Sequence, residues 1–115
     1  MIKGGKNIAM KVPPHQWSRT VAFYESVLGL PVLERDPASV AFKFGPNRLW
    51  IDRVEALSQA ELWLELTTDD LVAADATLAA ARVTRRDEIE ELPDGFKGFW
   101  IANPAEIIHL VSETE

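Results

Sequence analysis

One stretch limits most strongly what this chain can fold into: residues 18–44, SRTVAFYESVLGLPVLERDPASVAFKF. Its first part repeats apolar residues at the spacing of one helical face, which predicts a helix of about three turns with Ser18 as its N-cap. Gly29 then predicts a left-handed stop, and Pro31 forbids continuation. Two short alternating runs follow on either side of Asp36-Pro37, and they predict an antiparallel pair of strands.

Strands on both sides of this stretch complete a βαβββ unit. Residues 7–12 alternate between polar and apolar side chains, which predicts the first strand. Residues 48–53 predict the fourth strand, so the unit closes near Val54. The loop between the first strand and the helix holds His15, which we expect to be a solvated side chain without a functional role.

The second half of the chain repeats this order. Residues 61–68 alternate, with leucines at 62, 64 and 66 on one face, and we expect those leucines to face a helix. That helix is predicted to begin at an N-cap on Thr68 or Asp69 and to end in the basic segment 82–86, without the glycine that stops the first helix. We expect Gly4-Gly5 to be a flexible terminus. Three further strands are predicted, around residues 88–92, 99–102 and 107–111.

Composition and charge limit the class of protein. With 115 residues, 47% of them hydrophobic, and no cysteine, the chain is predicted to form one globular domain without disulfides or a thiolate metal site. The net charge is −6: residues 1–54 hold eight basic and four acidic residues, and residues 55–115 hold four and fourteen. We expect no nucleic-acid partner, because phosphate contacts need a basic surface. No apolar run is long enough for a bilayer, so we expect a cytoplasmic protein without a membrane partner.

Three segments of the chain resemble the vicinal oxygen chelate superfamily, the group of glyoxalases, bleomycin resistance proteins and extradiol dioxygenases. They are FYESVLGLPV at 23–32, TTDDLVAADATL at 67–78 and GFWIANPAEIIHLV at 98–111. The resemblance implies an α+β fold in which two βαβββ modules form a cup-shaped mixed sheet. These modules would cover about 1–54 and 61–115 of a single domain, 1–115. The resemblance also implies a cup that holds a divalent metal or an organic ligand, and a homodimer.

The resemblance places the family's metal-binding positions on this sequence. They fall on Asn7, Trp63 and His109, with a further position near Asp52. Metal-binding members usually have histidine, glutamine or glutamate at the first position, and an asparagine carbonyl is a weaker ligand. Tryptophan does not bind a metal, so only His109 matches well. We therefore expect no complete metal site and no cofactor.

A shifted metal site remains an alternative. His109, Glu65 and Asp52 would supply imidazole and oxygen ligands to a divalent metal, and the chain would then be a lyase, isomerase or dioxygenase. Glu65 or His109 would move protons in such an enzyme. Without a metal, we expect His109 to be a hydrogen-bonded strand histidine and Glu65 to pair with Lys11 or Arg48.

Tryptophans on the predicted strands favour a different hypothesis, in which the cup binds a small organic ligand without a metal. An aromatic cup with a few polar groups binds small apolar or cationic molecules by stacking and cation–π contacts, and the acidic second half suits a basic ligand. A third hypothesis is a non-catalytic structural dimer whose tryptophans fill the cup. The residues predicted to line the ligand site are Asn7, Trp50, Trp63, Glu65, Trp100 and His109.

Overall fold

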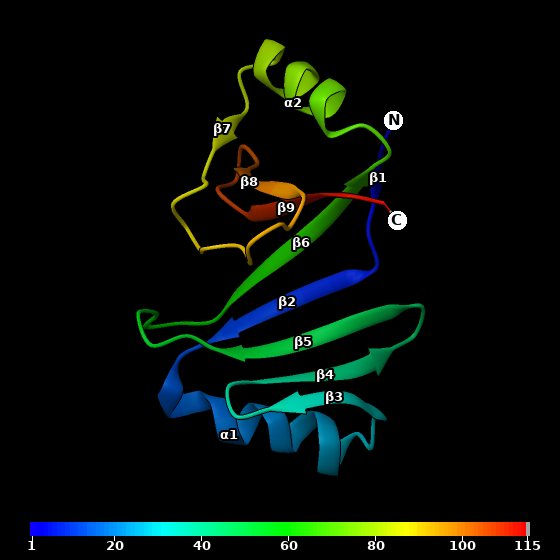
Figure 1. Ribbon diagram of the computed structural model, residues 1–115. Helices are drawn as coiled ribbons and strands as arrows, with labels where there is room; N and C mark the ends of the chain where they lie inside the picture. Colours follow the sequence, from blue (N-terminus) through cyan, green and yellow to red (C-terminus); the bar gives the residue numbers. More distant parts are fainter. Residues whose placement is uncertain (115) are drawn as a thin grey trace. The chain divides into compact units, whose positions relative to one another are not determined.

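The computed structural model describes residues 1–114 and divides into two compact units. The first unit comprises Lys6–Trp63, and the second comprises Met1–Gly5 together with Leu64–Glu115. Each unit holds one α-helix and strands that pair in both parallel and antiparallel directions (Figure 1). We describe each unit by itself.

The first unit follows the predicted βαβββ order. Its strands pair in the order β3-β4-β5-β2-β6, of which β2 and β5 are parallel and the other neighbours antiparallel. The helical segment continues from α1 into a π-helical turn, η1. The elements are β2 (Asn7–Val12), α1 (Pro14–Ala22), η1 (Phe23–Val27), β3 (Val32–Asp36), β4 (Ser39–Phe44), β5 (Asn47–Arg53) and the beginning of β6 (Glu61–Thr68).

The second unit repeats this pairing pattern. Its first module strand, β6, is again parallel to its last, β9, and β9-β8-β7 are antiparallel neighbours. An additional strand, β1, pairs antiparallel with β6. The α+β class with two βαβββ modules is therefore confirmed. The remaining elements are β1 (Ile2–Gly4), α2 (Leu71–Ala80), β7 (Thr84–Arg85), β8 (Gly98–Ala102) and β9 (Ile108–Glu113).

Each unit has its own core between its helix and one face of its sheet. In the first unit, Trp17 and Tyr24 of the helical segment pack on a buried cluster from the helix and the strands, which comprises Val12, Val21, Val40, Phe42, Leu49 and Ile51. In the second unit, Leu71 and Leu78 of α2 pack on a smaller cluster of Phe99, Ile101 and Val111. The opposite face of each sheet is thereby left to other side chains.

The first helix begins earlier than the sequence indicated. α1 starts at Pro14, with Pro13 as its N-cap, rather than at a Ser18 N-cap. Proline suits the first turn because its ring sets φ and its missing N–H has no helical partner there. The N–H of Gln16 donates to the carbonyl oxygen of Pro13 at 3.0 Å. His15 therefore lies in the first turn of α1, where it is exposed, and not on a loop.

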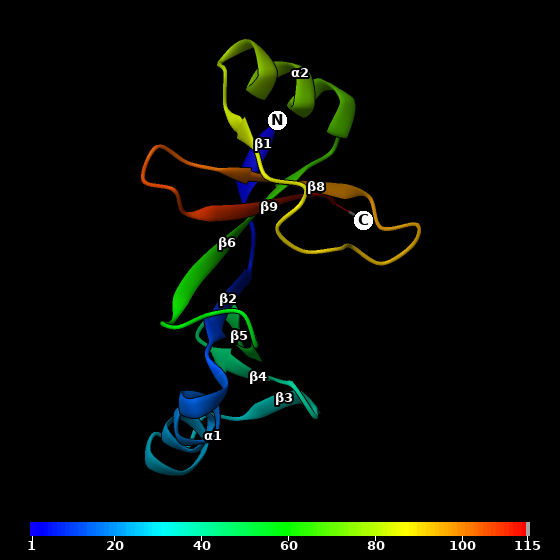
Figure 2. The same ribbon diagram turned by 90° about the vertical axis from the view of Figure 1, so that its left-hand side faces the viewer.

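The strand predicted around residues 88–92 is wrong. The second unit instead has the two-residue strand β7, and residues 86–97 form a connection that Figure 2 shows as the long yellow and orange loop leading to β8. The N–H of Ile89 donates to the carbonyl oxygen of Arg86 at 3.0 Å, which turns the chain instead of extending it. Hydrogen bonds within local turns therefore replace the strand pairing that was predicted for these residues.

Two of the three leucines on β6 were also misassigned. Only Leu66 packs against the core cluster under α2. Leu62 is 48% exposed and Leu64 is 39% exposed. α2 has ten residues and contributes Leu71 and Leu78 to the core of the second unit. It therefore covers only part of β6.

The expected flexible terminus at Gly4-Gly5 is ordered. Gly4 ends β1, and the N–H of Gly5 donates to the carbonyl oxygen of Glu65 at 2.8 Å. A Cβ atom at Gly5 would collide with the Glu65 side chain. Glycine at this position leaves room for the Glu65 side chain, which would have to move to admit a larger residue.

The two ends of α2 also differ from the prediction. At the start, Asp70 rather than Thr68 or Asp69 is the N-cap, and its carboxylate accepts from the N–H of Ala73 at 3.0 Å. At the end, the N–H groups of residues 82 and 83 donate to the carbonyl oxygens of residues 79 and 78, both at 3.0 Å. This is a Schellman motif. Arg82 occupies its left-handed position with φ 60°.

Replacing Arg82 with glycine is expected to stabilise the protein by about 1 kcal/mol, because a side chain in the left-handed region is disfavoured. Gly29→Ala is the matched control. Gly29 has φ 69° and open space around its Cβ position, so the alanine should destabilise by a similar amount. Urea denaturation checks both variants. A loss of stability in R82G would contradict the prediction.

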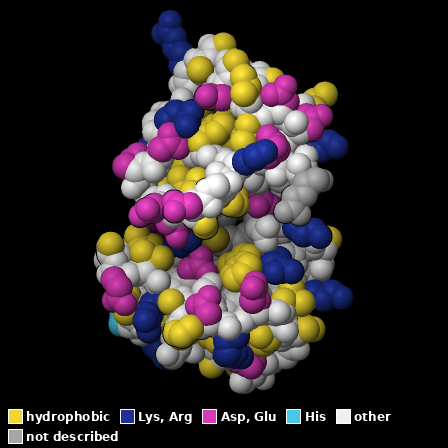
Figure 3. All heavy atoms as spheres, in the orientation of Figure 1, with side chains coloured by type: hydrophobic (Ala, Val, Ile, Leu, Met, Phe, Trp, Pro, Cys, Tyr) yellow, Lys and Arg dark blue, Asp and Glu magenta, His cyan; other side chains and the backbone are white. Residues whose placement is uncertain are grey.

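Surface charge differs between the two units. The first holds seven basic and six acidic residues, and the second holds five and twelve. On the face shown in Figure 3, basic side chains are scattered among acidic and hydrophobic ones. No helix within residues 1–114 is long and apolar enough to cross a bilayer.

Candidate functional site

Polar and aromatic side chains gather on the face of the first unit's sheet that points away from α1. Strand residues alternate between faces, so β2 sends Ile8 and Met10 toward the helical core and its intervening residues to the opposite face. We call this opposite face the polar face. Its members used below are Asn7, Ala9, Lys11, Ser39, Ala41, Arg48, Trp50, Asp52 and Trp63.

Two tryptophans flank an alanine on the polar face. Ala41, Trp50, Ala9 and Trp63 are successive register partners on four neighbouring strands. Because neighbouring strands are about 4.8 Å apart, the two indoles rise on either side of the small Ala9 side chain. Trp50 is half-buried, whereas Trp63 is 6% exposed. Trp50 therefore presents the more accessible ring.

Each of these indoles is held by a hydrogen bond. Nε1 of Trp50 donates to Oδ1 of Asn7 at 3.0 Å, and Nε1 of Trp63 donates to Oε1 of Glu61 at 3.0 Å. The Lys11 ammonium lies 4.4 Å from the centre of the Trp63 ring, in cation–π geometry. Rings held in this way lose little side-chain entropy when a ligand stacks on them.

A buried ion pair lies at the other end of the polar face. Nζ of Lys11 donates to Oδ2 of Asp52 at 2.8 Å, and the two side chains are 6% and 20% exposed. The Ser39 hydroxyl donates to Oδ1 of the same carboxylate. Both oxygens of Asp52 therefore already accept hydrogen bonds from the protein.

Glu65 and His109 lie on opposite faces of the second unit's sheet. β6 and β9 pair Leu64 with His109 and Glu65 with Leu110, and paired residues share a face. His109 lines a pocket beside α2, where its Nδ1 lies 3.0 Å from the carbonyl oxygen of Ile107. The side chains of Glu65 and His109 therefore do not converge.

Trp100 is a buried anchor for the connection between β7 and β8. It is 7% exposed, and its Nε1 donates to the carbonyl oxygen of Glu90 at 2.9 Å. Its N–H donates to Oδ1 of Asp87 at 3.0 Å, and its carbonyl oxygen accepts from the N–H of Arg86 at 2.9 Å. In the same connection, a hydrogen bond from Arg86 holds the pKa of Glu88 below its ordinary value. These contacts tie Trp100 to the connection, and its predicted part in the ligand site stays a prediction.

The proposed metal ligands do not fit a divalent metal. The Asp52 carboxylate is occupied by Lys11 and Ser39, and Glu65 and His109 face opposite ways. Three convergent ligands are the usual requirement. Residues 1–114 contain no group of three or more histidine, aspartate and glutamate side chains arranged to hold a metal ion.

Sequence reasoning missed the partners that organise the polar face. Glu65 was expected to pair with Lys11 or Arg48. The pairing of Lys11 with Asp52 and the hydrogen bonds of Ser39 and Glu61 were not predicted. Lys11 follows Asn7 by four residues on an alternating strand, which placed it on the same face. The parallel register of β2 with β5, which makes Lys11 and Asp52 partners, is a long-range contact without a local signal.

Comparison with known proteins identifies similar structures but no similar sequence. No family model and no curated protein sequence matches the chain. The chain is similar to a Mn(II)-bound glyoxalase from Novosphingobium aromaticivorans, with TM-score 0.69 and 20% identity over 97% of this chain and 39% of the other. It is also similar to 2,2',3-trihydroxybiphenyl 1,2-dioxygenase from Sphingomonas wittichii, with TM-score 0.71 and 18% identity over 100% and 42%.

A third similar structure matches the length of this chain. It is a glyoxalase/bleomycin resistance protein/dioxygenase superfamily member from Vibrio splendidus, with TM-score 0.64 and 13% identity over 93% of this chain and 97% of the other. By contrast, the chain spans only 39% and 42% of the first two structures. At sequence identities of 13% to 20%, the comparison shows a shared fold but not a shared activity.

Proposed function

We propose that this chain, which has the fold of the glyoxalase, bleomycin resistance and dioxygenase superfamily, binds a small planar organic ligand without a metal. The observation that supports this most directly is the row of Trp50, Ala9 and Trp63 across the polar face, with both indoles held by hydrogen bonds. The sequence predicted a ligand site that includes both tryptophans and Asn7. Trp50 and Asn7 are the members through which a ligand on this face would be recognised.

Trp50 is suited to stacking. Its register partners on the two neighbouring strands, Ala41 and Ala9, are small, so a planar group can approach the ring over these two residues. The hydrogen bond to Asn7 fixes the orientation of the indole. Stacking and cation–π contacts of this kind contribute about 0.5 to 2 kcal/mol each.

The charged side chains of the polar face are paired, so the face itself has no unbalanced charge that would repel a basic ligand. Lys11 is paired with Asp52 at 2.8 Å, and Arg48 with Glu34 at 3.4 Å. The Arg48 guanidinium lies 5.8 Å from the Trp50 ring, but its charge is offset by this carboxylate. The preference for a basic ligand rests on the net charge of −6 of the whole chain, which attracts cations at long range, because the first unit by itself is nearly neutral.

The alternative of a metal-dependent lyase, isomerase or dioxygenase has less support. It would need Asp52 to leave Lys11 and Ser39, and Glu65 and His109 to reach the same ion from opposite faces. The expected homodimer stays a prediction, which sedimentation at low protein concentration tests.

Titration with the planar cation 9-aminoacridine tests the proposed function. Binding, measured by calorimetry, should weaken about tenfold in Trp50→Leu, the equivalent of 1.4 kcal/mol. The matched control is Trp17→Leu, because Trp17 lies on the helical side of the same sheet, where its Nε1 donates to the carbonyl oxygen of Ile51. That variant should bind as the parent does once both are shown to be folded.

Three further results decide between the hypotheses. Addition of EDTA should leave the dissociation constant unchanged, and a loss of binding would favour the metal-dependent alternative. The anion 2-naphthalenesulfonate should bind more weakly than the cation. Equal affinity of the parent and W50L for 9-aminoacridine would reject the polar face as the site.

A further inference from the structure

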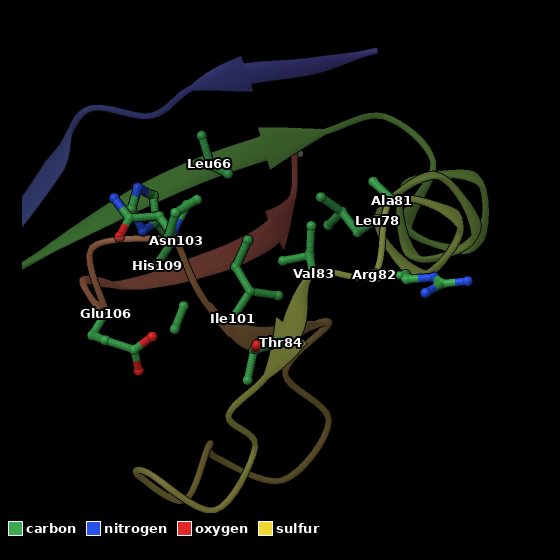
Figure 4. Close-up of a pocket in the computed structure, with 12 residues that line it drawn as sticks. Leu66, Leu78, Ala81, Arg82, Val83, Thr84, Ile101, Asn103, Glu106 and His109 are labelled. Carbon is green, nitrogen blue, oxygen red and sulfur yellow. The ribbon is translucent and has the colours of Figure 1, made fainter.

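A pocket of about 340 Å³ lies between α2 and the sheet of the second unit, on the face opposite to Glu65. Its apolar walls are Leu66, Leu78, Val83 and Ile101, which also belong to the core under α2. Figure 4 shows His109 and Asn103 together at one end and Arg82 at the other, with the guanidinium directed away from the lining side chains. The volume is in the range of small-molecule sites.

The pocket exists because α2 fills little space. Five of its ten residues are alanine, and only Leu71 and Leu78 pack on the core. The helical segment of the first unit brings the much larger Trp17 and Tyr24 to its sheet. The same βαβββ fold therefore has a filled helix-to-sheet space in one unit and an open one in the other.

The end of the pocket at His109 offers one hydrogen-bond acceptor and one donor. Nδ1 of His109 donates to the carbonyl oxygen of Ile107 at 3.0 Å, which leaves Nε2 as an acceptor in the neutral ring. Oδ1 of Asn103 accepts from the N–H groups of Ala105 and Ile107, both at 2.9 Å, which leaves its NH₂ group as a donor. Neither nitrogen has a hydrogen-bond partner among residues 1–114.

The rim of the pocket holds unusual backbone conformations. Arg82 has φ 60° and Glu106 has φ 66°, and within the described part of the chain these are the two non-glycine residues with positive φ. Both line the pocket. Arg82 takes this conformation where α2 ends, and Glu106 takes it in a turn in which its N–H donates to the carbonyl oxygen of Asn103 at 2.9 Å. Both backbone turns therefore shape the rim of the pocket.

We infer that this pocket is a second binding site, which takes a neutral, mainly apolar molecule with one hydroxyl group, such as an aromatic alcohol. The hydroxyl would donate to Nε2 of His109 and accept from the amide of Asn103, while the carbon skeleton contacts the aliphatic walls. The second unit has five basic and twelve acidic residues, and Glu106 lines the pocket, so an anionic ligand is disfavoured. The site differs from the proposed cation site on the polar face of the first unit.

An NMR titration with 2-naphthol tests this inference, with naphthalene and 2-naphthoate as matched ligands. We expect 2-naphthol to shift the amide signals of Val83, Thr84 and Ile101. Naphthalene, without the hydroxyl, should bind about threefold to tenfold more weakly, and so should the anion 2-naphthoate. His109→Leu should weaken 2-naphthol by the same factor and leave naphthalene unchanged.

Variants at the C-terminal end of α2, one at its last residue Ala80 and one at its C-cap Ala81, provide the controls. Ala81→Phe places a ring at the pocket and should weaken 2-naphthol by about tenfold or more, whereas Ala80→Phe, on the same helix but outside the lining, should have no effect. Both alanines are exposed, so these variants remain informative if H109L fails to fold. Unchanged binding in A81F would overturn the inference, as would the absence of shifts up to the solubility limit. Because W50L leaves this pocket intact, loss of 2-naphthol binding in W50L would also overturn it.

Discussion

Replacing Phe42 with alanine should lower the free energy of unfolding by about 3 to 5 kcal/mol, the usual cost of removing a buried aromatic ring. Phe42 is 0% exposed and lies at the centre of the first unit's core. Its ring centre is 5.9 Å from that of Tyr24, which joins β4 to the helical segment. The alanine would remove this contact and leave a cavity between strand and helix.

Phe44→Ala is the matched control for Phe42→Ala. Both phenylalanines are on β4, but Phe44 is 44% exposed. We expect this substitution to change the stability by about 0.5 kcal/mol or less, as is usual for surface positions. Urea denaturation of the two variants measures the difference. A similar loss of stability in both would contradict the placement of the core.

Replacing Asp52 with alanine should destabilise the protein by about 3 kcal/mol, because it removes the carboxylate that pairs with the buried Lys11 ammonium. Lys11 and Asp52 are 6% and 20% exposed in their side chains and 2.8 Å apart. Because water is largely excluded around the Lys11 ammonium, its charge must be stabilised by neighbouring protein groups. Ser39 would lose its acceptor in the same variant.

An exposed ion pair of equal length provides the comparison. Asp75 is 2.8 Å from Arg85, with side chains 50% and 42% exposed, and Asp75→Ala should change the stability by less than about 1 kcal/mol. The double variant Lys11→Met with Asp52→Leu should recover most of the loss in D52A, because apolar replacement of both partners removes the buried charges. Urea denaturation checks all three. A loss below about 1 kcal/mol in D52A would contradict the buried pair.

The fold was predictable where local signals agreed. Gly29, with φ 69°, ends the first helical segment as its glycine indicated, and the alternating strands β3, β4 and β5 formed close to their predicted bounds. The errors lie where local signals were weak or were outweighed. The segment that holds His15 was read as a loop, although α1 begins at Pro14, and an acidic loop was read as a strand.

The candidate site was predictable only in part. Alternation placed Asn7 and Lys11 on one face of β2, and register placed Trp50 and Trp63 beside Ala9. The pairing of Lys11 with Asp52 depends on residues 41 positions apart. His109 and Glu65 were predicted to line one ligand site, but β6 and β9 pair in a register that places the two side chains on opposite faces. One residue of shift in a strand reverses every face.

The sequence by itself determined the duplicated βαβββ pattern, because helix and strand periods, a glycine stop and proline breaks are local properties of consecutive residues. Only the tertiary structure decided which side chains meet. The tertiary structure pairs Lys11 and Ser39 with Asp52, and it places Glu65 and His109 on opposite faces of a sheet. It also leaves a pocket under the alanine-rich α2, which packs on its sheet through Leu71 and Leu78. The helical segment of the first unit instead packs on its sheet through the larger Trp17 and Tyr24. These outcomes depend on the register of the strands and on the side-chain volume packed between each helix and its sheet. Neither quantity can be predicted from a short stretch of sequence.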